Sequence, residues 1–195
     1  MCALTIYLWD WSRNNMPYLV TFPRSGSHYF EKLIYEKEGI HIEKSHSIDL
    51  LFDENNNKIR KIITIVRDPK DSITSFISLE EQRGRRTLFF QNLRIHQMMS
   101  EYITTNNFLY EHADYVIDFN DLVVHPDLVI KKIIELLEIN KEDYKNFNTT
   151  QHEYSKNYVT SSKNLSSYDK NILYNFDMGL CYFYYNKMLE RKIII

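Results

Sequence analysis

The chain has 195 residues, of which 44% are hydrophobic and 26% charged, and its formal net charge at pH 7 is −2. This length and apolar fraction suffice for one compact core. The low number of glycines and prolines, four of each, argues against a low-complexity or disordered chain. Because the net charge is close to zero, no global field attracts a nucleic acid or an anionic membrane, and an anion site must come from local Arg and Lys residues.

The beginning of the chain carries an apolar stretch, residues 3–9, that runs directly into Asp10 and has no basic residue before it. This stretch is too short for a signal peptide or a membrane span, and no other run reaches about 18 apolar residues. Cys2 and Cys181 lie near opposite ends of the chain, and we interpret both as free thiols of a reducing compartment. We therefore expect a cytoplasmic protein without a membrane span.

The first half of the chain repeats a pattern of strand, turn and helix. Residues 18–22 form a short apolar strand, and a helix follows in which apolar residues recur at helical spacing. Residues 61–66 form a second buried strand, after which Asp68 and Pro69 provide a helix N-cap and a proline in the first turn. The pattern predicts parallel strands joined by helices.

The second half continues the alternation. We predict a long helix over 87–106, a third strand over 115–119, and a C-terminal helical segment over 168–191 whose apolar face covers the core. Between the last two lies an amphipathic helix over 127–137. Its predicted inward residues are Leu128, Ile130, Ile133, Ile134 and Leu137.

Together these elements predict an α/β fold with a parallel sheet flanked by helices on both faces. We expect a single domain over 1–195, with an N-terminal extension at 1–17, a core at 18–139 and a C-terminal region at 140–195. Ligands of such sheets bind at the carboxyl ends of the strands.

The first strand is followed by the segment TFPRSGSHY, residues 21–29. A loop between a strand and a helix directs backbone N–H groups and the helix dipole at an anion. Gly26 permits close approach of the backbone, and Arg24 adds a fixed charge with a forked set of donors. Taken alone, the segment also fits a tight turn with a helix cap. It is not a Walker A loop, because the order Gly-x-x-x-x-Gly-Lys-Ser/Thr is absent.

This segment resembles the 5′-phosphosulfate loop of the sulfotransferase family, T-[YF]-P-[KR]-[ST]-G-[ST]-[TS]-[WF]. Three further blocks follow in the family's order: residues 43–47 are similar to its Lys-Thr-His segment, 67–75 to its 3′-phosphate signature R-[ND]-P-x-D-x-x-x-S, and 116–122 to its strand-ending Y-E-D-L. The resemblance implies a P-loop-like sulfotransferase fold and the donor 3′-phosphoadenosine 5′-phosphosulfate (PAPS), with the bisphosphate PAP as product and no metal.

The resemblance also implies roles for individual residues. His46 would be the general base, and Arg24 and Lys44 would contact the transferring group. The expected nucleotide-binding residues are Arg24, Ser25, Gly26, Ser27, His28, Tyr29, Arg67, Ser75, Phe119 and Lys163. Without the resemblance, His46 could equally be a surface histidine, and Arg67 a surface arginine beside an Asp-Pro helix cap.

The sequence departs from the family pattern at several positions. Arg24 stands where cytosolic members generally have Lys, Tyr29 where many have Trp, and Phe119 where the family has Tyr. The late R-K-G-x-x-G block has no clean counterpart, and Lys163 in the segment 161–163 is its candidate replacement. We expect a small-molecule or carbohydrate acceptor with a hydroxyl or amine, and no nucleic acid partner. A homo-oligomer is compatible with the sequence. The alternatives are a nucleotide-dependent kinase with a non-standard phosphate loop, or a nucleotide-binding module that has lost transfer.

Overall fold

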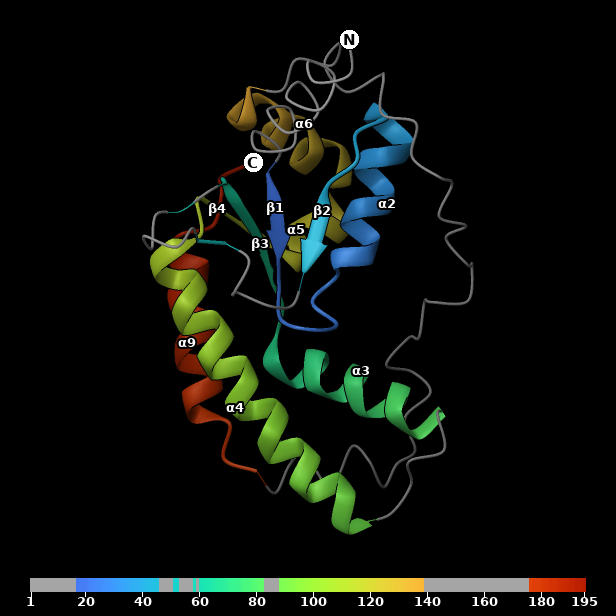
Figure 1. The fold of residues 1–195 in the computed structure, drawn as a ribbon, viewed down its shortest axis with the longest axis vertical. Coiled ribbons are helices and arrows are strands. Elements are labelled where there is room, and N and C mark those ends of the chain that lie inside the picture. Colours follow the sequence, from blue (N-terminus) through green and yellow to red (C-terminus); the bar gives the residue numbers. More distant parts are fainter. Residues whose placement is uncertain (1–16, 46–50, 53–57, 59, 83–87, 139–175) are drawn as a thin grey trace, which may run out of the picture.

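The structure is a computed structural model, and it describes residues 17–45, 51–52, 58, 60–82, 88–138 and 176–195. The described strands are β1 (Tyr18–Val20), β2 (Glu43–Ser45), β3 (Ile62–Val66) and β4 (Tyr115–Asp118). They form one parallel sheet in the order β2-β1-β3-β4 (Figure 1). The carboxyl ends of all four strands therefore lie at one edge of this sheet.

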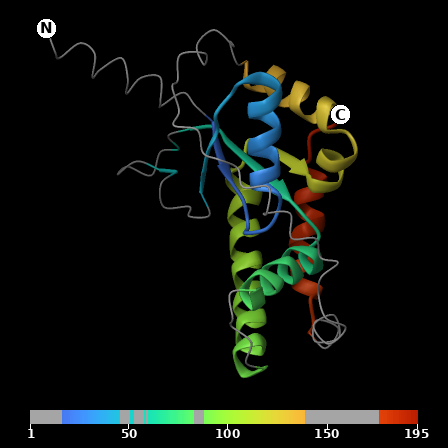
Figure 2. The ribbon, with the colours of Figure 1, turned by 90° about the vertical axis from the view of Figure 1, so that its right-hand side faces the viewer.

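The described helices connect and cover these strands. They are α2 (Ser27–Glu38), α3 (Pro69–Gln82), α4 (Leu88–His112), α5 (Phe119–Val124), α6 (Pro126–Leu137) and α9 (Gly179–Glu190). The fold class predicted from the sequence is confirmed, because these helices pack on both faces of a parallel sheet (Figures 1 and 2). All five residues of β3 are buried, as expected for a strand with neighbours on both sides and helices on both faces.

One face of the sheet packs against α2, α5 and α6. Leu19, Ile63, Ile65 and Ile117 project from the strands into this layer, where they meet apolar side chains of the three helices. The opposite face packs against α4 and α9 through Val20, Ile62, Val66 and Val116. Alternate strand residues point to opposite faces, so a short apolar strand supplies both layers.

A third cluster lies beyond the carboxyl ends of the strands. There α3 packs against α4 and α9, and the cluster contains Phe22 from the loop after β1 together with Ile73, Tyr102 and Cys181. Cys181 is a buried free thiol, whereas Cys2 lies outside the described residues. In Figure 1, α3 lies below the carboxyl ends of the strands. Phe22 anchors the loop after β1 in this cluster, and Tyr102 donates a hydrogen bond to the loop after β3.

The predicted element boundaries are corrected at several places. β2 was not predicted as a strand, β4 ends one residue early because Phe119 begins α5, and the long helix α4 extends to His112. Leu128 was predicted to face inward but is 52% exposed, while its neighbour Val129 is buried. Helix α6 begins at Pro126, and its buried residues are Val129, Ile130 and Ile133, while Ile134 and Leu137 are partly buried against the same cluster. The described C-terminal helix is α9, and residues 168–175 lie outside the described part.

Candidate functional site

The loop between β1 and α2 turns sharply through two left-handed residues. Arg24 has φ +68° and Gly26 has φ +104°, and α2 begins at Ser27. The amide of Phe30 donates to the Gly26 carbonyl at 3.0 Å, which starts the helical hydrogen bonds. The segment predicted as a phosphosulfate loop therefore reaches the N-terminus of a twelve-residue helix, where amide groups are available to an anion.

Within this loop the predicted residues divide by exposure. The side chains of Ser25 and Ser27 are buried, whereas His28 and Tyr29 are exposed, with 39% of Tyr29 accessible. Tyr29 is thus available to stack on a ligand, and the two serines lie inside the turn.

The loop after β3 is fixed by two tyrosines from the helical layer. The Tyr102 hydroxyl donates to the Arg67 carbonyl at 2.7 Å, and the Tyr182 hydroxyl donates to Asp68 Oδ1 at 3.4 Å. Asp68 also caps α3, because its carboxylate accepts from the Asp71 amide at 3.2 Å. The predicted N-cap is therefore confirmed. Sequence reasoning missed Tyr102 and Tyr182, because neither belongs to a family block and only the fold brings α4 and α9 to this loop.

The two loops contact each other directly. Arg67 Nη1 donates to the carbonyl oxygen of Arg24 at 3.1 Å, and Arg24 Nε donates to the hydroxyl of Ser75 at 3.1 Å. Residues that are 43 and 51 positions apart in sequence thus form one cluster at the carboxyl edge of the sheet. The structure brings Arg24, Arg67 and Ser75 together, as the order of the motifs predicts.

Phe119, the first residue after β4, completes this cluster. The Arg67 guanidinium lies over its ring, 4.5 Å from the centroid, and a Cβ atom placed on Gly26 would lie 2.6 Å from two carbons of the same ring. The phenyl ring therefore fills the space between the first loop and Arg67. A glycine is required at position 26 by both its left-handed φ and this contact.

The Arg67 side chain is a largely desolvated cation. Burial lowers its pKa, while the nearby carboxylates of Asp71 and Asp68 favour its charged form. Its closest carboxylate, Asp71, is 3.9 Å from Nη2, and among the described residues its buried Nε has no hydrogen-bond partner. A buried guanidinium N–H without an acceptor is a favourable contact point for an anion.

Lys44 extends from β2 toward the first turns of α2. Its ammonium forms a hydrogen-bonded ion pair with Glu31 and lies 2.7 Å from His28 Nδ1. β2 ends at Ser45, level with Val20 of β1, at the carboxyl edge. The predicted base His46 and the predicted cation Lys163 lie outside the described residues.

The chain matches the family model of the sulfotransferase domain over residues 8–177. It belongs to the sulfotransferase domain family. A search of curated proteins and a search of solved structures each gave no match. Membership in this family assigns sulfuryl transfer as the general activity, and the match covers all four sequence blocks and both contacting loops.

Two features are absent from the described part of this sulfotransferase. None of its described helices is long and apolar enough to cross a membrane. None of its described His, Cys, Asp and Glu residues gather in a group of three suited to a metal ion.

Proposed function

We propose that this sulfotransferase takes its sulfuryl group from PAPS and transfers it to an acceptor hydroxyl or amine. The observation that carries the proposal is the direct contact between the loops after β1 and β3, made by Arg67 Nη1 and the Arg24 carbonyl at 3.1 Å. A nucleotide with phosphates at both its 5′ and 3′ positions needs two anion sites on one surface, and these contacting loops would supply them side by side.

The residues present fit such a nucleotide. The backbone from Ser25 to Tyr29, with Arg24, would hold the 5′-phosphosulfate at the N-terminus of α2. Arg67 would hold the 3′-phosphate, because its buried Nε has no partner among the described residues and its charge is only weakly compensated. Ser75 would complete that site, and the exposed ring of Tyr29 would stack on the adenine. Phe119 would act by holding the guanidinium of Arg67.

When bound, PAPS supplies an activated sulfuryl group on a phosphate leaving group. The chain must then orient the acceptor, remove its proton and stabilise the charge that develops. We assign proton removal to His46, whose ordinary pKa near 6.5 suits a base at neutral pH. Arg24 and Lys44 would stabilise negative charge on the transferring and bridging oxygens; Arg24 acts by charge and hydrogen bonds alone, because a guanidinium does not release its proton. This assignment requires no metal ion.

The assignment of Arg67 is tested by Arg67→Ala, with two ligands titrated calorimetrically. Adenosine 3′,5′-bisphosphate should bind about ten- to a hundredfold more weakly, the value of one charge-assisted hydrogen bond. Adenosine 5′-phosphate, which lacks the 3′-phosphate, should bind as it does to the wild type. Equal weakening of both ligands would assign Arg67 another role.

The reaction itself is tested by a labelled-sulfate transfer screen over sugars, phenols, alcohols and amines, with the bisphosphate product measured separately. Transfer that is unaffected by a chelator supports the proposal. Nucleotide binding that depends on Mg²⁺ would instead indicate a kinase, and nucleotide binding without transfer to any acceptor would indicate a binding module.

A further inference from the structure

Two side chains of α2 converge on the ammonium group of Lys44. Glu31 forms an ion pair with it, and His28 Nδ1 lies 2.7 Å from it. The Glu31 side chain is 12% exposed and that of Lys44 is 24% exposed, so the pair is mostly shielded from water. No sequence block includes Glu31, and the proposed function gives it no part.

The position of Glu31 is unfavourable for nucleotide binding by itself. It lies one turn after Ser27 on the helix whose N-terminus is the proposed 5′-phosphosulfate site. A carboxylate at this place repels a phosphate and opposes the helix dipole's attraction for anions. A shielded carboxylate beside an anion site therefore requires a compensating role, and its contact with Lys44 provides one.

The second contact has a defined direction. A lysine ammonium has three N–H donors and no acceptor, so in this contact Lys44 donates and His28 Nδ1 accepts. His28 Nδ1 also lies 3.9 Å from Glu31 Oε2. One N–H of Lys44 is then directed at Glu31 and one at His28, so that among the described residues the third has no acceptor and can serve a ligand.

We infer that Glu31 is a positioning residue: it holds the Lys44 ammonium beside the phosphosulfate loop, with His28 as the second support. This inference rests on the proposed function, in which Lys44 stabilises charge on the transferring group. A free lysine side chain samples many rotamers, whereas two fixed contacts keep the ammonium at one place before the donor binds. Glu31 thus improves turnover while it weakens binding of the anionic nucleotide.

This division gives a signature that a merely structural residue does not produce. Glu31→Gln removes the carboxylate charge and releases Lys44 without changing the size of the side chain. We expect kcat to fall about ten- to a hundredfold, since misplacement of a catalytic group has effects of this order. Binding of adenosine 3′,5′-bisphosphate should become about three- to tenfold tighter, because a negative charge close to the phosphate site is gone.

The chain offers a matched control on the same helix. Glu36 is 56% exposed and pairs only with Lys32 among the described residues, so Glu36→Gln makes the same charge change away from Lys44. Its kcat should stay within about twofold of the wild type. Glu31→Asp keeps the charge but shortens the reach by one methylene group. It should lower kcat without tightening nucleotide binding.

The experiment measures kcat, bisphosphate affinity and thermal unfolding for the wild type and the three variants. A lower kcat with unchanged or tighter binding in Glu31→Gln, together with a normal Glu36→Gln, supports the inference. An unchanged kcat in Glu31→Gln, or a loss of nucleotide binding, overturns it. If Glu31→Gln does not unfold cooperatively, Glu31→Asp decides instead: a lower kcat with unchanged binding supports the inference, and any other result overturns it. A wild type without nucleotide binding or transfer would overturn the proposed function, whereas an active wild type with an unaffected Glu31→Gln would overturn this inference alone.

Discussion

At the scale of single residues, Gly26 is a position at which the site tolerates little change. Its φ of +104° is unfavourable for any residue with a Cβ atom, and that atom would lie 2.6 Å from the Phe119 ring. The ring cannot move freely, because the Arg67 guanidinium lies over it at 4.5 Å. We expect Gly26→Ala to lower the free energy of unfolding by about 2–5 kcal/mol, from backbone strain together with overpacking, as measured by urea denaturation.

The contribution of the ring contact is separated from the backbone strain by a double-mutant cycle. In Gly26→Ala/Phe119→Ala the steric conflict is gone but the strained φ remains. The double variant should therefore lose less stability than the sum of the two single variants. Additive losses of unfolding free energy would mean that the Phe119 ring moves aside at negligible energetic cost. Backbone strain would then account for the whole effect of Gly26→Ala.

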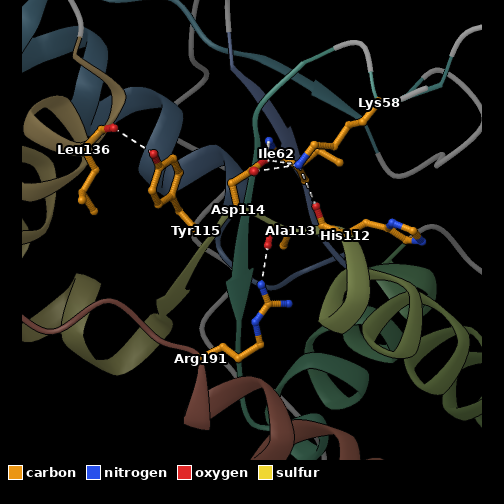
Figure 3. A network of polar contacts seen from close by, with 8 residues as sticks. All are labelled: Lys58, Ile62, His112, Ala113, Asp114, Tyr115, Leu136 and Arg191. Atoms are coloured by element: carbon orange, nitrogen blue, oxygen red, sulfur yellow. Dashed lines mark hydrogen bonds and ion pairs between the residues drawn. The ribbon is translucent and has the colours of Figure 1, made fainter.

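At the scale of secondary-structure elements, the carboxyl ends and the amino ends of the parallel strands carry different contacts. The carboxyl edge holds the proposed site, and the amino edge is joined by a polar network around Asp114 (Figure 3). The Asp114 carboxylate accepts from the Ile62 amide at 2.7 Å and from Lys58 Nζ at 2.6 Å. Arg191 donates to the Ala113 carbonyl at 2.8 Å, so the end of α9 is fixed at the same edge.

This network predicts a loss of stability without a loss of binding. In Asp114→Ala the amide of the buried residue Ile62 loses its side-chain acceptor, which should lower the free energy of unfolding by about 1–3 kcal/mol. Bisphosphate affinity, measured by calorimetry, should stay unchanged because the site lies at the other edge. Lys58→Ala serves as the control: its ion pair is about one-third exposed and should contribute less than about 1 kcal/mol. Equal losses in the two variants would show that the ion pair, not the backbone hydrogen bond, carries the effect.

The elements that the sequence predicts well are those with a strong apolar signal. Strand β3 is an uninterrupted apolar run, and the Asp68-Pro69 cap marks the start of α3 without ambiguity. Strand β2 was missed because its three residues, Glu43 to Ser45, are polar, and an edge strand needs no apolar side chains. Its existence depends on pairing with β1, which is a property of the fold.

The same distinction applies to the site. Arg24, Arg67 and Ser75 belong to ordered motifs that follow strands, so their convergence at one edge could be predicted. Glu31 and Tyr102 act only through the packing of α2 against β2 and of α4 against β3, and no local pattern marks them. The roles of His46 and Lys163 stay predictions, because both residues lie outside the described part of the chain.

At the scale of the whole molecule, α4 and α9 form a layer of ionisable side chains whose pKa values are raised by burial. Burial raises the pKa of Cys181 from 9.0 to about 11, and the nearby charge of Asp177 acts in the same direction. Burial, supported by nearby aspartates, raises the pKa values of Tyr182 and Tyr185 from 10.0 to about 12. Burial also raises the pKa of Tyr102. The folded protein thus keeps these protons at a pH at which the unfolded chain releases them.

The direction of the resulting pH dependence follows from these shifts. Each group contributes its full stabilisation below the pKa of the unfolded chain, 9.0 for Cys181 and 10.0 for the tyrosines. As the pH rises further, the unfolded chain binds fewer protons than the folded protein, and stability falls until the folded groups ionise near pH 11 to 12. We expect the urea midpoint to be constant near pH 8 and to decrease steadily above about pH 9.

Tyr185→Phe isolates one contribution to this decrease, because it keeps the ring and removes the ionisable hydroxyl. Its free energy of unfolding should decline less steeply than that of the wild type above about pH 10, by at most about 1.4 kcal/mol for each pH unit. Absorbance of the phenolate, followed in the folded and the urea-unfolded protein, reports the same difference directly. Parallel curves for Tyr185→Phe and the wild type would show that the Tyr185 phenol ionises equally in both states, so that the α4–α9 layer does not exclude water from it.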